Sequence, residues 1–346
     1  MDSSTVPVNR VPLTLTAKDF KSDQEVRWCP GCGDYSILAA MQRFMPELGI
    51  PRERIVFISG IGCSSRFPYY MNTYGMHSIH GRAPAIATGL SVSRPDLSVW
   101  VVTGDGDALS IGGNHLIHAL RRNVNLKILL FNNRIYGLTK GQYSPTSELG
   151  KITKSTPAGS ADAPFNPLSL ALGAEATFVA RTIDSDTRHL QSVLRRAAEH
   201  KGSAFVEIYQ NCNIFNDGAF ELLKDPSTRD DHLIRLEQGQ PVTFGPDGGF
   251  SVVHPEGSFG LKVQPGGPAI VHDATVDDPA YAFALTRLSG SDLSTTPIGV
   301  FRDVARPTYD DLIRKQLTDA QATATGTPDE MLADLLNTAD TWTIRP

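Results

Sequence analysis

The 346-residue sequence has only four cysteines, lacks an apolar run of membrane-spanning length and has no excess of basic residues. Four cysteines are few for a disulfide-stabilised secreted domain, and the lack of a long apolar run argues against a membrane span. The formal net charge of −5 argues against a general nucleic-acid binder. The first residues also lack the hydrophobic core of a signal peptide. We therefore expect a cytoplasmic protein that binds neither membranes nor nucleic acids.

The remaining composition is that of an ordinary globular protein, with 40% hydrophobic and 20% charged residues. The length allows one or two domains with a large core. Residues 1–27 are mostly polar, contain prolines and show no period. This segment is interpreted as a flexible N-terminal arm.

The most informative stretch joins two apolar runs, residues 98–103 and 126–131, which are predicted to be strands. Between them, apolar residues recur at three- and four-residue steps from Ile111 to Ala119, which predicts a helix. Gly104-Asp105-Gly106 follows the first run, and Asn132-Asn133 ends the second. Because ligands bind at the carboxyl ends of parallel strands, these polar residues are expected at a binding edge.

The side chains at this edge indicate a magnesium and phosphate site. Asp105 supplies an anionic oxygen and Asn133 an amide oxygen, which are ligands that Mg²⁺ prefers while sharing other positions with phosphates. The glycines allow the backbone to approach a diphosphate closely. A lone GDG is more often a simple turn. The paired GDG and NN, each at the end of a predicted strand, are more specific.

The four cysteines suggest a second centre. Cys29 and Cys32 form a CxxC knuckle around Pro-Gly, Cys63 lies in a glycine-rich loop after a predicted strand, and Cys212 follows another strand. Three interpretations remain open: an iron–sulfur cluster, a structural zinc ion or a redox-active pair. The cluster is favoured because two further cysteines are available at the same predicted sheet edge.

Two later regions have a looser pattern. Residues 139–166 are rich in Ser, Thr, Gly and Pro and are interpreted as a lid beside the Asn133 edge. Between residues 239 and 268, 13 of 30 residues are Gly or Pro, which excludes long regular elements. Short helices are predicted near residues 280–288 and 308–317. We expect residues 226–346 to form an irregular C-terminal extension that packs on a partner or on the domain surface.

Five motifs in order, WCPGCG, GIGCSSR, HSIHGRA, GDGD and NNRIYGLTKGQ, together with the late Cys212, resemble the beta subunit of 2-oxoacid:ferredoxin oxidoreductases. The resemblance spans about residues 28–222, and the C-terminal part resembles the extension of the 2-oxoglutarate type. It implies an α/β fold in which a mostly parallel sheet carries helices on both faces. Residues 28–225 would form the thiamine diphosphate-binding domain, and residues 226–346 would pack against another subunit.

The resemblance also implies the ligands of three cofactors. A 4Fe–4S cluster would be held by Cys29, Cys32, Cys63 and Cys212. Mg²⁺ would be held by Asp105, Asn133 and the carbonyl of Ile135. Thiamine diphosphate would be contacted by Ile61, Gly62, Cys63, Ser64, His80, Gly81, Arg82, Ala83, Gly106, Asp107, Gly137 and Leu138.

The implied reaction is the oxidative decarboxylation of 2-oxoglutarate with coenzyme A to succinyl-CoA and CO2, with electrons passing through the cluster to ferredoxin. Arg66 would face the substrate carboxylate, and Leu138 and Lys140 would help to select the 2-oxoacid. The glutamate that activates thiamine is not found in any cofactor motif, and the resemblance places it on an alpha subunit. Alternatives are pyruvate or another 2-oxoacid as substrate, a non-oxidative thiamine diphosphate lyase, and a zinc-stabilised binding module.

Overall fold

The computed structural model describes residues 15–290, 292–342 and 344. Its helices are α1 (Asp34–Phe44), α2 (Phe67–Tyr70), α3 (Ala83–Ser93), α4 (Asp105–Leu109), α5 (Gly113–Arg121), α6 (Pro167–Gly173), α7 (Thr187–Glu199), α8 (Glu221–Lys224), α9 (Arg229–His232), α10 (Pro279–Thr286), α11 (Tyr309–Thr323) and α12 (Pro328–Leu336). Its strands are β1 (Ile55–Ser59), β2 (Tyr74–His77), β3 (Ser98–Gly104), β4 (Lys127–Asn132), β5 (Phe178–Ile183), β6 (Ala204–Tyr209), β7 (Leu233–Leu236), β8 (Thr243–Phe244), β9 (Phe250–Val253), β10 (Lys262–Pro265) and β11 (Thr296–Asp303).

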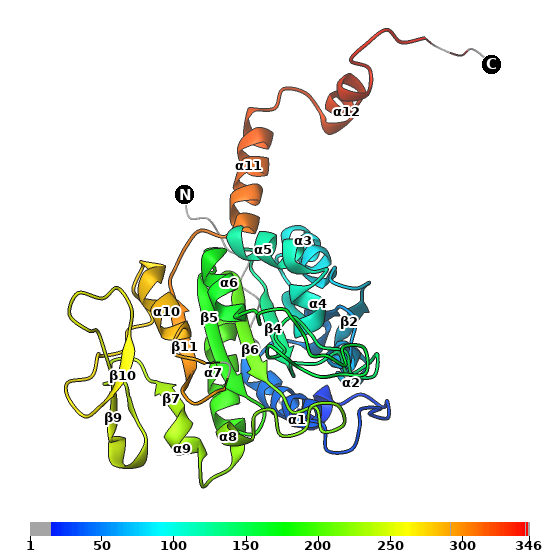
Figure 1. Ribbon diagram of the computed structural model, residues 1–346. Helices are drawn as coiled ribbons and strands as arrows, with labels where there is room; N and C mark the ends of the chain where they lie inside the picture. The colour runs from blue at the N-terminus through cyan, green and yellow to red at the C-terminus, as the bar shows by residue number, and fades with distance from the viewer. Residues whose placement is uncertain (1–14, 291, 343, 345–346) are drawn as a thin grey trace.

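Eight strands form the central sheet in the order β2-β1-β3-β4-β6-β5-β11-β7 (Figure 1). Neighbouring strands pair in parallel throughout, except that β11 runs antiparallel to β5. Three short strands, β8 to β10, form a separate antiparallel sheet. The predicted α/β fold with a mostly parallel sheet is confirmed.

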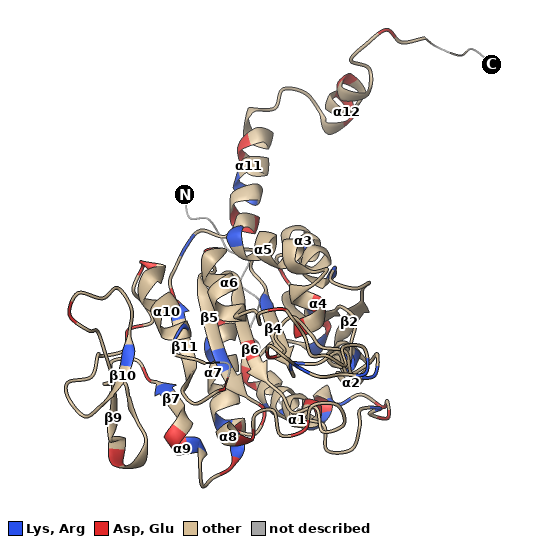
Figure 2. Ribbon diagram, in the orientation of Figure 1, with Lys and Arg blue, Asp and Glu red and all other residues tan. Residues whose placement is uncertain are grey.

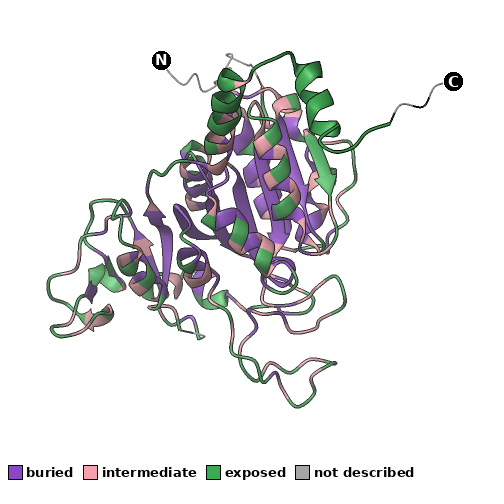
Figure 3. Cartoon of the chain, turned by 90° about the horizontal axis from the view of Figure 1, so that it is seen from above, coloured by how far each residue is buried: buried purple, intermediate pink, exposed green. Residues whose placement is uncertain are grey.

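Helices cover both faces of this sheet because successive strand residues point to opposite faces. Trp100 and Val102 pack in one hydrophobic cluster with α1 and α7. Val99 and Val101 pack in a second cluster with α3, α5 and α6. The central strands are therefore buried on both sides, as Figure 3 shows, which is the usual state of parallel strands, whereas the edge strand β2 is exposed.

The sheet register places the two halves of the central motif side by side. Gly104 at the end of β3 pairs with Phe131 near the end of β4. The chain continues from these positions into Asp105, the first residue of α4, and into Asn133. The carboxyl edge of the sheet thus brings the GDG and NN residues together, as the sequence predicts.

The region after residue 225 differs from the expected irregular extension. Strands β7 and β11 belong to the central sheet, where β11 pairs with residues 178–181 of β5 across a bulge. The Thr296–Asp303 strand is almost wholly buried. Its apolar residues do not alternate regularly with polar ones, so hydrophobic periodicity does not predict it as a strand. The two predicted helices correspond to α10 and α11.

The described part of the N-terminal arm, residues 15–27, also differs from the expected flexible terminus. Phe20 is fully buried in the core, and the Ser22 N–H donates to the Tyr70 carbonyl at 3.3 Å. One buried aromatic residue therefore fastens this segment to the domain. Residues 1–14 of the predicted arm lie outside the described residues.

Surface charge and hydropathy agree with the composition. Lys and Arg alternate with Asp and Glu along several elements, and α11 carries both signs (Figure 2). On that helix, Arg314 pairs with Asp310 at 2.9 Å and Lys315 with Asp319 at 2.6 Å. Among the described residues, every helix is too short or too polar to cross a membrane.

Candidate functional site

Asp105 is the buried carboxylate at the centre of the carboxyl edge. Its side chain is almost inaccessible, and Oδ2 accepts hydrogen bonds from Ser144 Oγ at 2.5 Å and Thr146 Oγ1 at 2.6 Å. Burial raises the pKa of Asp105 to about 6, although the two hydroxyl donors act in the opposite direction. The two donors hold Oδ2, and with it the carboxylate, in place.

Asn133 belongs to a tight turn after β4. Its Oδ1 accepts the N–H of Ile135 at 3.1 Å, and its own carbonyl accepts Asn216 Nδ2 at 2.9 Å. This turn directs the chain back over the edge of the sheet. The carboxylate of Asp105, the amide of Asn133 and the backbone of Ile135 line one cavity, and their oxygens have the chemistry of a magnesium site.

This first cavity, of about 80 Å³, collects most of the residues predicted to contact the cofactor. It is lined by Asp34, Ile61, Gly62, Cys63, Ser64, His80, Gly104, Asp105, Gly106, Asp107, Phe131, Asn133, Ile135, Tyr136, Gly137, Leu138, Thr139 and Gln210. Residues from four separate motifs therefore meet here. We call it the thiamine cavity, after the cofactor that the sequence resemblance implies.

Asp107 ties three of these motifs together. Its Oδ1 accepts the N–H groups of Ile61 at 3.1 Å and Gly81 at 2.8 Å, and His80 Nδ1 lies 2.7 Å away. Its Oδ2 accepts Thr103 Oγ1 at 2.7 Å. Both oxygens are thus engaged by the protein, which makes Asp107 an organiser of the cradle. Its predicted contact with diphosphate stays a prediction.

A close contact explains the glycine at position 106, the second residue of α4. A Cβ atom at this position would lie 2.2 Å from the ring of Tyr136, whose hydroxyl donates to the Gly106 carbonyl at 2.9 Å. The ring therefore closes over the GDG backbone. Tyr136 was not singled out by sequence, although it lies within the NNRIYG motif.

Three predicted contacts do not line the cavity. The Gly81 N–H is used by Asp107, and Ala83 is buried at the start of α3. Arg82 donates to the carbonyls of His80 at 3.3 Å and Ile111 at 3.4 Å. These residues shape the loop that carries His80.

The four cysteines line a second cavity of about 210 Å³, which we call the cysteine cavity. It also contains Arg66, Leu138 and Lys140, the residues predicted to face the substrate. A Cβ atom at Gly137 would lie 3.4 Å from Cys63 Sγ and 3.6 Å from Cys212 Sγ. The predicted convergence of the knuckle with the two distant cysteines is therefore present in the fold.

The buried thiols of this cavity are poor anions by themselves. Burial raises the pKa of the Cys32 thiol, and it raises the pKa of Cys63 to about 12. The nearby Asp34 and the other cysteines shift both in the same direction. Because metals bind thiolates, a metal centre would remove this penalty by supplying positive charge.

Within the described part of the chain, no three His, Cys, Asp or Glu side chains are gathered in a geometry that would hold a single metal ion. A four-iron cluster uses four cysteines as its ligands and distributes them over its iron atoms. Such ligands do not need to meet at one point. A set of four cysteines around one cavity therefore suits a cluster.

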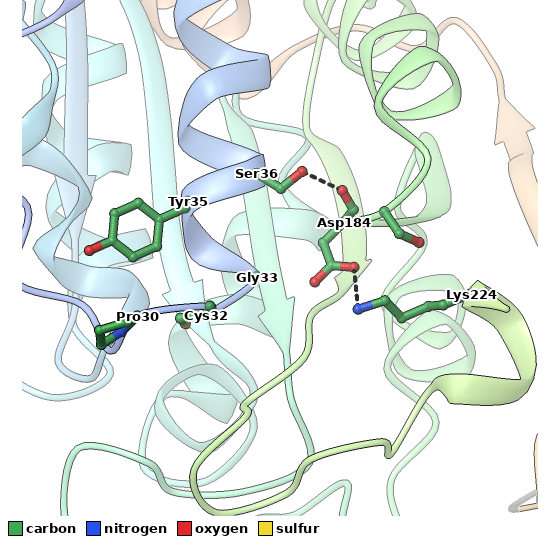
Figure 4. A pocket seen from close by; sticks show the side chains of 9 residues that line it. Pro30, Cys32, Gly33, Tyr35, Ser36, Asp184 and Lys224 are labelled. Atoms are coloured by element: carbon green, nitrogen blue, oxygen red, sulfur yellow. Dashed lines mark hydrogen bonds and ion pairs between the residues drawn. The ribbon is translucent and has the colours of Figure 1, made fainter.

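The CxxC knuckle is anchored on its outer side, where a pocket of about 550 Å³ opens (Figure 4). Ser36 Oγ donates to the Asp184 carbonyl at 2.6 Å, and Lys224 Nζ lies 3.6 Å from Asp184 Oδ1. A Cβ atom at Gly33 would lie 1.9 Å from Asp184 Oδ2. The glycine after Cys32 is thus required for close packing of the knuckle against the end of β5.

The segment from Thr139 to Asn166 is only in part the open lid that the sequence suggested. Ser144, Thr146 and Ser147 are buried, and Ser147 Oγ donates to the Arg134 carbonyl at 2.6 Å. The beginning of the segment is therefore part of the site. Its later residues are largely exposed.

Sequence reasoning missed the partly buried Tyr136 and four buried groups of the site: Asp34, Ser144, Thr146 and Gln210. Burial raises the pKa of Asp34 to about 7, and neither of its oxygens has a hydrogen bond within the described residues. Its place directly after the knuckle was the available signal. For Gln210, the signal was its position two residues before Cys212.

The comparisons agree with this geometry. The family model of the C-terminal TPP-binding domain of thiamine pyrophosphate enzymes matches residues 60–208. That range begins directly after β1 and contains β3, β4 and all but the last residue of β6. The carboxyl ends of these strands border the thiamine cavity. The fold and the site therefore define a thiamine diphosphate-binding protein.

Similar proteins narrow the assignment from thiamine diphosphate-binding proteins in general to one family. It is 64% identical over 333 residues to 2-oxoglutarate oxidoreductase subunit KorB of Mycobacterium tuberculosis, covering 94% of this chain and 88% of the relative. It is 39% identical to 2-oxoglutarate synthase subunit KorB of Archaeoglobus fulgidus, covering 63% and 82%. A solved 2-oxoglutarate:ferredoxin oxidoreductase from Magnetococcus marinus, with 2-oxoglutarate, coenzyme A and succinyl-CoA bound, aligns with a TM-score of 0.74 and 36% identity, covering 93% and 96%. The chain belongs to the family of 2-oxoacid:ferredoxin oxidoreductase beta subunits.

Proposed function

We propose that this chain is the beta subunit of a 2-oxoglutarate:ferredoxin oxidoreductase. The complex would decarboxylate 2-oxoglutarate oxidatively, form succinyl-CoA and CO2, and reduce ferredoxin through a 4Fe–4S cluster. This follows the names of its relatives and the substrates bound to the similar structure. The cytoplasmic location stays a prediction from the sequence.

One observation carries the redox part of the proposal. The thiamine cavity and the cysteine cavity share Cys63, Asn133, Gly137 and Leu138 among their lining residues. Electrons leaving a group in the first cavity would therefore have a short path to a cluster in the second. A non-oxidative thiamine lyase has no need for such a neighbour.

The residues of this chain would hold the cofactor as follows. Asp105, Asn133 and the Ile135 carbonyl would bind Mg²⁺, with Ser144 and Thr146 fixing the carboxylate. The backbone of the Ile61–Ser64 loop and of Gly106 would receive the diphosphate. Once bound, thiamine diphosphate supplies the electron sink that stabilises the carbanion left when CO2 departs.

Arg66 and Lys140 would set the choice of substrate. Both line the cysteine cavity beside Leu138, so two cations stand near one end of the thiamine cavity. A dicarboxylate such as 2-oxoglutarate has two anionic groups for them, whereas pyruvate has one. A pyruvate or other 2-oxoacid oxidoreductase remains the alternative, because Arg66 also donates to the Arg27 carbonyl at 3.3 Å.

The chain would supply half of the active site. In the described part of the chain, neither cavity has a glutamate among its lining residues. We propose that the glutamate that activates thiamine comes from the alpha subunit. The exposed side chains of Ile61 and Leu138, at 42% and 51%, border the cavity and are available for such a partner.

The test is to co-express the chain with its alpha partner, purify the complex without oxygen and measure coenzyme A-dependent viologen reduction with several 2-oxoacids. Activity with 2-oxoglutarate and little with pyruvate would support the full proposal. Preference for pyruvate would overturn the substrate assignment and retain the cofactors. A colourless complex without iron would overturn the cluster, and activity of the single chain would overturn the shared site.

A further inference from the structure

Gln210 is a buried amide between the two cavities. It follows β6 directly, is 1% exposed and has its N–H bonded to the Asn132 carbonyl at 3.0 Å. Its side-chain Nε2 donates to Cys32 Sγ at 3.2 Å and to the Asn211 carbonyl at 2.6 Å. The side chain therefore reaches from the carboxyl end of the sheet to a sulfur of the knuckle.

These two contacts fix the orientation of the amide. A carboxamide nitrogen has two protons, and here each has an acceptor, so the oxygen faces the other way. Gln210 Oε1 is buried without a hydrogen-bond partner among the described residues, and Gln210 lines the thiamine cavity. A buried acceptor without a partner is costly. An N–H or O–H donor on the occupant of the cavity would satisfy it.

We propose that Gln210 is a positioning residue that links the two cavities and raises the reduction potential of the cluster. Its Nε2–H group donates to the Cys32 sulfur, while Oε1 accepts a hydrogen bond from the thiamine cavity. The inference rests on the proposed function, because it takes Cys32 as a cluster ligand.

The sign of the effect follows from electrostatics. Hydrogen bonds to the sulfurs are among the factors that set the potential of an iron–sulfur cluster. The positive end of the N–H dipole lies against sulfur, so it stabilises the reduced cluster, which carries one more negative charge. Burial strengthens this effect because the local dielectric constant is low. A donor on Oε1 polarises the amide further, so filling the thiamine cavity raises the potential again.

The experiment is a redox titration of the complex with its alpha partner, followed by the electron paramagnetic resonance signal of the reduced cluster. Gln210→Met keeps the length and apolar volume of the side chain but loses both hydrogen bonds. We expect the ratio of oxidised to reduced cluster at a fixed potential to rise about tenfold, which corresponds to about 59 mV for one electron. Gln210→Glu replaces the donor with a carboxylate oxygen and is expected to lower the potential further.

Asn213→Ser is the matched control. Asn213 lies on the same loop and its Nδ2 donates to the Pro30 carbonyl of the knuckle at 2.6 Å, but within the described residues it donates to no sulfur. Its loss disturbs the knuckle without removing a donor to Cys32. The potential of this variant is expected to match that of the unaltered complex.

A second measurement compares complexes depleted of thiamine diphosphate with complexes reconstituted with it. We expect reconstitution to raise the potential of the unaltered complex and to leave that of Gln210→Met unchanged. An equal response in both would overturn the role of Oε1.

The outcomes separate this inference from the proposed function. An unchanged or raised potential in both Gln210 variants, with iron and sulfide intact, would overturn the inference and leave the function standing. If Gln210→Met loses its iron, the test rests on Gln210→Glu, which keeps the side-chain shape. A reduction potential that is not lowered in that variant would then overturn the inference. An unaltered complex without any cluster signal would overturn the proposed cluster and the inference together.

Discussion

Polar side chains are buried at both ends of the central sheet, but the two ends differ in whether the protein supplies hydrogen-bond partners for them. At the amino ends of the strands, Lys127 Nζ donates to the carbonyls of His200 at 2.6 Å and Gly202 at 3.2 Å. Nearby, Asn123 accepts from Thr177 and Ser203 and donates to two carbonyls of the segment that leads into α11. The buried polar atoms of Lys127 and Asn123 all have hydrogen bonds.

At the carboxyl ends, several buried atoms have no such partner within the described residues: both carboxyl oxygens of Asp34, Ser64 Oγ and Gln210 Oε1. Buried polar groups in folded proteins are nearly always paired, so each exception needs an explanation. At the amino end, the chain itself satisfies the buried polar groups of Lys127 and Asn123, which serve stability, although Arg302 Nε and Nη1 lack a hydrogen bond within the described residues. At the carboxyl end, the chain leaves positions that a ligand completes.

The largest expected effect comes from removing a cysteine at the carboxyl end. Cys212→Ser should lose the iron and sulfide of the complex and reduce viologen reduction at least about hundredfold, since even outer partners of metal ligands cost 10–100-fold. Thiamine diphosphate binding should change little, because Asp105 and Asn133 are untouched. Iron analysis, activity and thiamine titration measure the three quantities. Full iron content in the variant, or zinc in the unaltered protein, would contradict the assignment.

The next effect concerns the amino end. Asn123→Ala should lower the free energy of unfolding by about 3 kcal/mol, because it leaves several buried groups unpaired. The left-handed backbone of Asn123, with φ at 52°, adds strain for alanine. Urea denaturation measures the loss, and Asn123→Asp, which keeps the two accepted bonds, should lose less. A weaker affinity for thiamine diphosphate in the folded variant would contradict the view that the buried polar groups of the amino end serve stability alone.

A smaller effect is expected where the chain itself supports the ligand site. Thr146→Val removes the donor to Asp105 Oδ2 and a second bond to Asn132 Oδ1 at 2.9 Å. We expect Mg²⁺-dependent thiamine diphosphate binding to weaken about tenfold, as for other groups that orient metal ligands. Calorimetric titration of the complex measures this. Thr153→Val, on the same segment, is the control, and equal losses in both variants would rule out a specific role.

The smallest effect tests whether a buried group at the carboxyl end serves stability, rather than ligand binding, when the protein itself already supplies its hydrogen bond. His189 lies near the carboxyl end of β5, but its Nδ1 already meets Thr182 Oγ1 at 2.8 Å. Burial, followed by the positive charge of Arg235, lowers the pKa of His189 to about 4. As the pH falls below about 6.5, the unfolded chain takes up a proton that the folded chain does not, so stability falls.

At pH 5.5 this amounts to about 1 kcal/mol, since one pH unit corresponds to at most about 1.4 kcal/mol per proton. His189→Gln should remove this part of the acid dependence, seen as a smaller shift of the urea midpoint between pH 7 and 5.5. Cofactor affinity should be unaltered. The same pH dependence in both proteins would show that His189 titrates normally.

The parts of the site predictable from sequence were those with local signals. GDG and NN end two strands that are adjacent along the chain, and adjacent parallel strands align their carboxyl ends. Cys63 and Cys212 follow strands as well, so their convergence with the knuckle was also accessible. The sequence resemblance then supplied the identity of the cofactors.

The remaining parts depend on contacts between distant residues. Ser144 and Thr146 reach Asp105 from about forty residues away, and no period marks them. Gln210 and Asp34 lie close to cysteines in the sequence, but their burial, which a single sequence does not report, is what distinguishes them from ordinary polar residues. Strand β11 follows the short strands β8 to β10 and helix α10, and its antiparallel pairing with β5 depends on tertiary packing rather than on local sequence.

That pairing has a consequence for any shortened form of the protein. Every residue of β5 is buried, and β11 covers the hydrogen-bonding edge that β6 leaves open. A chain ending near residue 225 would expose that edge as an unpaired, largely apolar strand, which is a template for pairing with other chains. The C-terminal region thus protects the domain from self-association, whatever else it contacts.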